Sequence, residues 1–174
     1  MNSVIYVGID VHKDFLSISA FRENDQKPFI EINKQDANPN KLKKYFKKMK
    51  EKGNIICCYE AGFSGFALYH LLQDLGITCL VIAPGLIPQK PGDRIKTDRR
   101  DAKNLAINLR AGMLTPIHIP SPNDEAVRSF LRMRDNIKND EKRKKQQILS
   151  FTMHLGLRYT EGKNWTGKRG NKRN

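Results

Sequence analysis

The hydrophobic period of this chain changes from two to 3.6 after its first three apolar runs, and this change limits the fold more than any other feature. Residues 3–10 (SVIYVGID) and 15–21 alternate apolar side chains with others, which is typical of β-strands. Residues 28–32 form a third short run behind a polar turn. Three successive strands of this kind predict an antiparallel meander.

The next part of the chain has the pattern of alternating helices and strands. Residues 38–51 and 65–75 place apolar side chains at helical spacing, and a glycine closely follows each segment. Residues 54–59 and 77–83 are largely apolar, as expected for buried strands. Strand–helix–strand units connect parallel strands in a right-handed sense. We therefore expect an α/β fold with a mixed sheet, in which an antiparallel three-strand meander precedes parallel strands, and helices cover both faces.

Two acidic residues lie where predicted strands end. Asp10 ends the first strand, and Glu60 ends the strand that begins at residue 54. In α/β sheets, ligands collect beyond the carboxyl ends of the strands. Both carboxylates are therefore candidates for a functional site at one edge of the sheet.

Two further acidic residues begin a predicted helix. Residues 96–113 (KTDRRDAKNLAINLRAGM) carry an apolar stripe at helical spacing, which consists of Ala102, Leu105, Ala106, Leu109 and Met113. Counting back along this stripe reaches Asp98 and Asp101, so both carboxylates are expected to face the sheet. Several like charges in a low dielectric are costly unless a cation neutralises them. A divalent cation with oxygen ligands, Mg²⁺ with Mn²⁺ as a substitute, meets this need.

Each of these acids also has an ordinary structural interpretation. The two at the helix start could cap the helix, with Thr97 as an alternative cap. Glu60 could be a surface acid, and Asp10 a turn residue. Of the four histidines only His12 is expected near the site, and a turn histidine without a catalytic role is the preferred interpretation. The prediction of a metal site therefore depends on the convergence of the four acids.

Three short motifs resemble those of a known family. The strings YVGIDVHKD, YEAG and KTDRRDA occur in the order found in the N-terminal RuvC-like (RNase H-like) domain of DEDD-type insertion-sequence transposases. This family, that of insertion sequence one-ten and its pilin-gene inverting relatives, contains RNA-guided bridge recombinases. The resemblance extends from residue 5 to about residue 165. It implies a catalytic, metal-binding tetrad at the matching positions Asp10, Glu60, Asp98 and Asp101.

The resemblance also implies an activity and a domain order. It implies Mg²⁺-dependent cleavage and exchange of DNA strands in transposition, with DNA as a partner. Whether a structured guide RNA is also a partner does not follow from the sequence. Relatives continue through a helical region into a second domain that supplies a serine nucleophile, and none of the seven serines here matches that position. We therefore expect that domain to be absent and the chain alone to be inactive in recombination. A catalytically silent module that binds nucleic acid or dimerises is the alternative.

The residue pattern in the last third of the chain predicts a helical (coiled-coil) arm. Ser121 and Pro122 are typical of a helix start. Residues 138–147 contain no apolar side chain, whereas residues 148–157 are again rich in them. Such an arm could meet another subunit, giving a homo-oligomer, or the second domain, and a simple surface helix is the alternative. The expected divisions are a RuvC-like domain at 1–115, an arm at 116–158 and a basic, disordered tail at 159–174.

The composition favours nucleic acid as a partner. Lys and Arg number 32 against 18 Asp and Glu, a net charge of +14, which strengthens binding to phosphates. The candidates for nucleic-acid contact are the basic residues around the proposed site, namely Arg94, Lys96, Arg99, Arg100 and Lys103. A second set of lysines, on residues 41–52, is interpreted as a solvated helix face.

Other classes of function have little support in the sequence. The three cysteines, Cys57, Cys58 and Cys79, lie in predicted strands without metal-ligand spacing. No apolar stretch reaches the ~20 residues of a membrane span, so we expect a soluble, cytoplasmic protein without a membrane partner. An actin-like or sugar-kinase-like ATPase needs glycine and threonine after its first-strand aspartate, whereas Val11 and His12 occupy those positions.

Overall fold

The computed structural model describes residues 3–88 and 98–157 of the chain. The chain divides into two compact units, Met1–Ile119 and Pro120–Asn174. Among the residues described, the first unit contains the five-stranded sheet and three α-helices, and the second contains one long helix. The site residues predicted from the sequence all belong to the first unit.

The first unit is built on a five-stranded mixed sheet with the order β3-β2-β1-β4-β5. Its strands are β1 (Val4–Val11), β2 (Phe15–Arg22), β3 (Ile30–Asp36), β4 (Asn54–Glu60) and β5 (Thr78–Ile82). Strands β1, β2 and β3 form an antiparallel meander, while β4 pairs in parallel with both β1 and β5. This is the RNase H-like sheet expected from the sequence.

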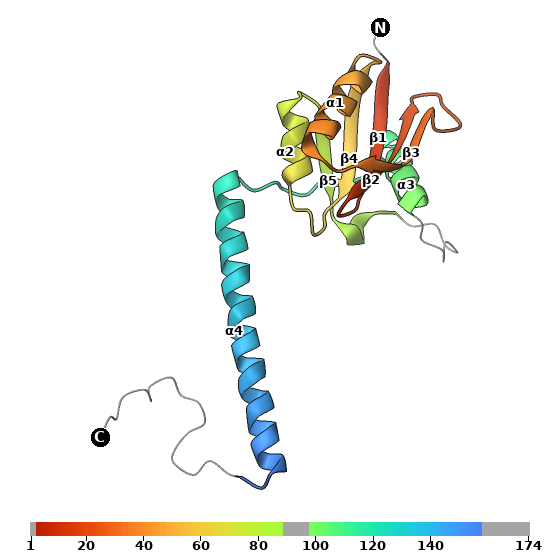
Figure 1. Ribbon diagram of the computed structural model, residues 1–174. Coiled ribbons are helices and arrows are strands. Elements are labelled where there is room, and N and C mark those ends of the chain that lie inside the picture. The colour runs from red at the N-terminus through yellow and green to blue at the C-terminus, as the bar shows by residue number, and fades with distance from the viewer. Residues whose placement is uncertain (1–2, 89–97, 158–174) are drawn as a thin grey trace. The chain divides into compact units, whose positions relative to one another are not determined.

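Helices cover both faces of the sheet (Figure 1). On one face α1 (Pro39–Lys50) and α2 (Ala67–Asp74) contribute Phe46 and Leu72 to the main core, where both are fully buried. On the other face α3 (Asp98–Arg110) packs Leu105 and Leu109 against Cys58 and Ile82. The three cysteines are buried and unpaired, as predicted for small core residues.

Two sequence predictions about element limits are wrong. The third strand runs from Ile30 to Asp36 rather than over residues 28–32, because β2 pairs with a polar stretch as far as Asp36. Met113 does not continue the apolar stripe of α3. The helix ends at Arg110, and Gly112 then adopts a positive φ of 67°, which leaves Met113 exposed.

Helix α3 lies unusually close to β1 because residue 8 is a glycine. A Cβ at Gly8 would lie only 2.1 Å from the carbonyl oxygen of Ala102 and 2.4 Å from the amide nitrogen of Ala106. At the other end of the helix, the Arg110 guanidinium donates to the carbonyl oxygens of Arg22 at 3.1 Å and Asp25 at 2.7 Å. These contacts determine where the first turn of α3 meets the sheet.

The second unit contains α4 (Pro122–His154). Ser121 caps this helix, since its hydroxyl accepts a hydrogen bond from the amide of Asp124 at 3.1 Å. None of its side chains is buried. The predicted basic tail at 159–174 lies outside the described residues. Across the ranges 3–88 and 98–157, no helix has both the length and the apolar character of a membrane span.

Candidate metal centre

Asp10 and Glu60 occupy matching positions on neighbouring parallel strands. The register between β1 and β4 pairs Ile9 with Tyr59, and each acid is the next residue along its strand. Both acids therefore lie on the same face of the sheet at its carboxyl-terminal edge. This is the face that α3 covers, because Gly8, two residues before Asp10, contacts that helix.

A histidine connects the sheet to the first turn of α3. The Nε2 atom of His12 lies 3.0 Å from Oδ2 of Asp10 and 3.3 Å from Oδ2 of Asp98. The His12 ring also stacks on Phe15, with ring centroids 4.4 Å apart, and its backbone amide donates to the carbonyl of Phe15 at 2.9 Å. The turn between β1 and β2 thus holds the imidazole against both carboxylates.

The environment of Asp10 disfavours its charge. Burial raises the pKa of Asp10 above its ordinary value, the neighbouring His12 acts in the opposite direction, and the charges of Asp101 and Asp98 raise the pKa further. A carboxylate that is only 21% exposed and has two acids nearby is stabilised when a cation neutralises it.

The donor atoms at this position suit a divalent metal ion. Asp10, His12 and Asp98 each offer a ligand atom, and these atoms lie within 4.8 Å of one another. Carboxylate oxygens are preferred by Mg²⁺ and Mn²⁺, and an imidazole nitrogen is compatible with Mn²⁺ and other transition metals. The residues present therefore fit a divalent cation.

The four predicted acids contribute to this centre unequally. Asp98 reaches it from the first turn of α3, so its carboxylate lies toward the sheet edge as predicted. Its side chain is nevertheless 54% exposed, so it is not buried in the low-dielectric environment that was expected. Asp101 influences Asp10 through its charge. Within residues 3–88 and 98–157, neither Asp101 nor Glu60 belongs to the 4.8 Å cluster.

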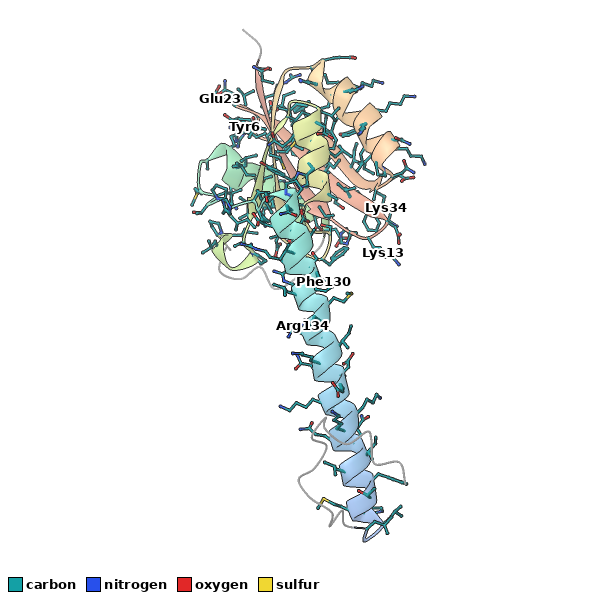
Figure 2. The ribbon with its side chains drawn as sticks, turned by 90° about the vertical axis from the view of Figure 1, so that its left-hand side faces the viewer. Tyr6, Lys13, Glu23, Lys34, Phe130 and Arg134 are labelled. Carbon is teal, nitrogen blue, oxygen red and sulfur yellow. The ribbon has the colours of Figure 1, made fainter. Side chains whose placement is uncertain are left out.

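The sequence places His12 near the site, but a turn histidine without a catalytic role is the interpretation that it favours, and the structure instead brings His12 into the cluster. Its position two residues after Asp10 was the available signal, because alternate residues of an extended chain share a face. Two exposed lysines lie close to His12, in sequence or through Phe15. Lys34 lies over the Phe15 ring at 5.7 Å, and Lys13 follows His12 directly; both are exposed and labelled in Figure 2.

The structure describes only some of the residues that were predicted to contact nucleic acid. Arg94 and Lys96 lie outside the described residues, and only the backbone of Arg99 is described. Arg100 is exposed and Lys103 is half-buried on α3. These two basic residues flank Asp101 on the helix that forms one side of the candidate centre.

Comparison with known proteins assigns the family. The model of a transposase family, the DEDD transposases of the IS110 type, matches residues 7–154 of the chain. The chain belongs to this family. It is 39% identical over 160 residues to the transposase for insertion sequence element IS1533 of Leptospira borgpetersenii, covering 91% of this chain and 46% of that protein.

A second relative has a similar extent of match. The y4qE protein of Sinorhizobium fredii is 38% identical over 165 residues, which cover 92% of this chain and 42% of that protein. The chain thus spans less than half the length of these two relatives. The predicted membership of the insertion-sequence transposase family is confirmed.

Proposed function

We propose that this chain is the metal-binding catalytic region of a DNA transposase, and that it holds Mg²⁺ for cleavage and exchange of DNA strands. The observation that carries the proposal is the contact of His12 with both Asp10 and Asp98 at the carboxyl-terminal edge of the sheet. Membership of the transposase family makes DNA the expected substrate.

In this proposal Asp10, Glu60, Asp98 and Asp101 form the acidic site, and His12 joins it. Bound magnesium supplies electrostatic stabilisation of the charge that develops on phosphate oxygens during an in-line displacement. Asp10 is the central ligand, because it is the least exposed member of the cluster. His12 keeps the carboxylates of Asp10 and Asp98 close together before the metal binds.

The basic residues near the centre complete the proposed site. Arg100 and Lys103 on α3, with Arg94, Lys96 and Arg99, provide positive charge for the DNA backbone. A structured guide RNA would be a second nucleic-acid partner of these residues.

We also propose that α4 mediates self-association, because its large apolar side chains are exposed. A silent module that binds DNA without cleaving it is the second candidate.

A manganese-binding experiment tests the metal centre. Crystals of the chain soaked in millimolar Mn²⁺ are expected to give an anomalous-diffraction peak between Asp10 and the start of α3. Calorimetric titration is expected to show that Asp10→Asn weakens Mn²⁺ binding by at least about tenfold. Asp14→Asn is the matched control, because Asp14 is an exposed acid four residues away with the same charge. Absence of a peak near these carboxylates would contradict the proposal.

A nicking assay then distinguishes the active domain from the silent module. Supercoiled plasmid is incubated with the chain and Mg²⁺ or Mn²⁺, with Asp10→Asn as the negative control. Metal-dependent nicking that Asp10→Asn abolishes is expected of a nuclease. Metal binding without nicking would instead favour the silent module.

A further inference from the structure

The turn after β4 carries the most exposed of the large apolar side chains among the residues described. Phe63 is 76% exposed, although it lies only three residues after Glu60, the acid that ends β4. Burial of a phenylalanine ring ordinarily stabilises a protein, and Phe66, three residues further on, does pack against the main core. The residues described thus leave the ring of Phe63 largely uncovered.

The backbone that carries Phe63 is held by two hydrogen bonds. The Gly65 amide donates to the Gly62 carbonyl at 3.3 Å, which closes a tight turn with Phe63 at its second position. Gly65 has a φ of 59°, a conformation that favours glycine. The hydroxyl of Tyr59 donates to the Gly65 carbonyl at 3.1 Å. A ligand that covers the phenyl ring therefore meets a backbone that is already positioned, which lowers the entropic cost of binding.

This turn lies at the same edge of the sheet as the metal centre. Strands β1 and β4 are parallel neighbours, so Asp10 and the turn that follows Glu60 are both at the carboxyl-terminal edge. The loop after β5 begins beside this turn, because the Ala61 amide donates to the Ile82 carbonyl at 2.8 Å, and Figure 1 shows both loops at one end of the sheet. That loop carries a second exposed apolar side chain, Leu86, at 56%.

A nucleobase is the ligand that best matches an exposed aromatic ring at this edge. Because the chain belongs to a transposase family and carries a net charge of +14, DNA is the expected ligand. Aromatic side chains bind bases by stacking, with little regard to sequence. In a continuous duplex the neighbouring base pairs cover both faces of each base, so a protein ring can stack only on an unpaired base or at a strand end.

We infer that Phe63 stacks on an unpaired base of the DNA strand whose phosphate lies at the metal centre. The preferred substrate is then DNA with single-stranded or displaced bases next to the cleaved phosphate, rather than continuous duplex. Leu86 supplies a second apolar contact from the neighbouring loop. The inference rests on the proposed function, because it takes DNA as the ligand, and it adds the state of the DNA that the site selects.

Binding to single-stranded and duplex DNA tests this preference. Fluorescence anisotropy of the 174-residue chain compares oligo(dT) with a duplex of the same length, with Ca²⁺ in place of Mg²⁺ to prevent cleavage. Phe63→Ala is expected to raise the Kd for oligo(dT) by about tenfold and the Kd for the duplex by less than about twofold. Phe151→Ala is the control, because it truncates a phenylalanine of similar exposure, 63%, in the second unit.

Two further variants distinguish stacking from the burial of an apolar surface. Phe63→Trp keeps an aromatic face and is expected to retain full affinity for oligo(dT), whereas Phe63→Leu keeps only apolar volume and is expected to bind as weakly as Phe63→Ala. The chain contains one tryptophan, so Phe63→Trp combined with Trp165→Phe gives a single fluorophore at the turn. Oligo(dT) is expected to quench its emission by stacking.

Several results would overturn the inference. No binding of oligo(dT) by the original chain, unchanged binding by Phe63→Ala, or an equal loss for the duplex would exclude selective stacking on an unpaired base. Full affinity of Phe63→Leu would show that only an apolar surface is needed. Weaker self-association of Phe63→Ala in sedimentation equilibrium, with unchanged DNA binding, would assign the ring to a protein interface.

Manganese titration of the same variants reports separately on the proposed metal centre. Phe63→Ala is expected to bind Mn²⁺ as the original chain does, because a phenyl ring offers no donor atom to the metal. Absence of Mn²⁺ binding by the original chain would contradict the metal centre and leave the result with oligo(dT) as it is. Loss of oligo(dT) selectivity with Mn²⁺ binding intact would contradict only the role of Phe63.

Discussion

At the scale of single residues, the character of Asp10 comes from its burial in the fold, from His12 in the following turn and from the acids of α3. Its pKa is raised mainly by burial, and its closest partners belong to the following turn and to α3. The alternation of β1 predicted which face Asp10 occupies. It also placed His12 near Asp10, but the contact of the His12 ring with both Asp10 and Asp98 depends on the hairpin turn, on stacking against Phe15 and on the position of α3.

Tyr45 on α1 allows a residue-scale prediction about stability. Its hydroxyl oxygen is buried and has no hydrogen-bond partner among the residues described, and burial raises its pKa to about 12. An unpaired buried hydroxyl destabilises the folded state. Tyr45→Phe is therefore expected to leave the free energy of unfolding at pH 7 unchanged or to raise it by about 1 kcal/mol.

The same variant has a predicted pH dependence. The pKa of Tyr45 is higher in the folded state than the ordinary value of 10.0, so the unfolded chain ionises first as the pH rises. Ionisation of Tyr45 therefore does not affect the free energy of unfolding below the ordinary pKa. As the pH rises from 10.0 toward about 12, the chain with Tyr45 loses stability, because only the unfolded state ionises readily. The advantage of Tyr45→Phe in urea unfolding should consequently grow across this range. Tyr69→Phe is the control, and a Tyr45→Phe variant clearly less stable at pH 7 would reveal a hydrogen bond at this hydroxyl.

At the scale of elements, the position of α3 determines whether its acids can reach the sheet. The helix and its apolar stripe followed from periodicity, and Ala102, Leu105, Ala106 and Leu109 are buried as predicted. The short distance between α3 and the sheet could not be predicted from the sequence, because periodicity identifies the buried face of a helix but not how near that face lies to the sheet. That distance depends on Gly8, which admits the helix backbone.

Replacement of Gly8 is expected to displace α3. The methyl group of Gly8→Ala would meet helix backbone at 2.1 Å and 2.4 Å, and backbone cannot move aside as a flexible side chain can. We expect a loss of about 3 kcal/mol in the free energy of urea unfolding and weaker Mn²⁺ binding. Gly85→Ala is the matched control, because its added Cβ would have no atom within 4 Å. Equal stability of the two variants would contradict the assigned role of Gly8.

At the scale of the whole molecule, the charge of +14 makes binding to nucleic acid sensitive to salt. Two basic regions could contribute to it. Arg100 and Lys103 adjoin the metal centre, whereas α1 carries exposed lysines on its outer face, including Lys43 and Lys48. Charge alone does not distinguish a DNA-binding surface from a solvated one, and position relative to the acidic site favours the first pair.

The salt dependence of DNA binding can separate these regions. In fluorescence anisotropy with duplex DNA, the dissociation constant is expected to rise steeply with NaCl. Replacing both Arg100 and Lys103 by alanine is expected to reduce the slope of log K against log [salt] by about two. Replacing Lys43 and Lys48 removes the same charge and is expected to change the slope little. A larger effect of the α1 pair would place the DNA on the opposite face of the sheet.

The sequence by itself determined the order of strands and helices, the family, and the placement of Asp10 and Glu60 at the ends of adjacent parallel strands. These properties follow from local periodicity and short motifs, which involve only residues that are close in sequence and can be identified before the fold is known. Only the tertiary structure decided that β3 continues through polar residues to Asp36, that Asp98 is largely exposed, and that His12 joins the two carboxylates. Each of these depends on contacts between segments far apart in the chain, or on the direction of a turn, and such contacts leave no periodic signal in the sequence.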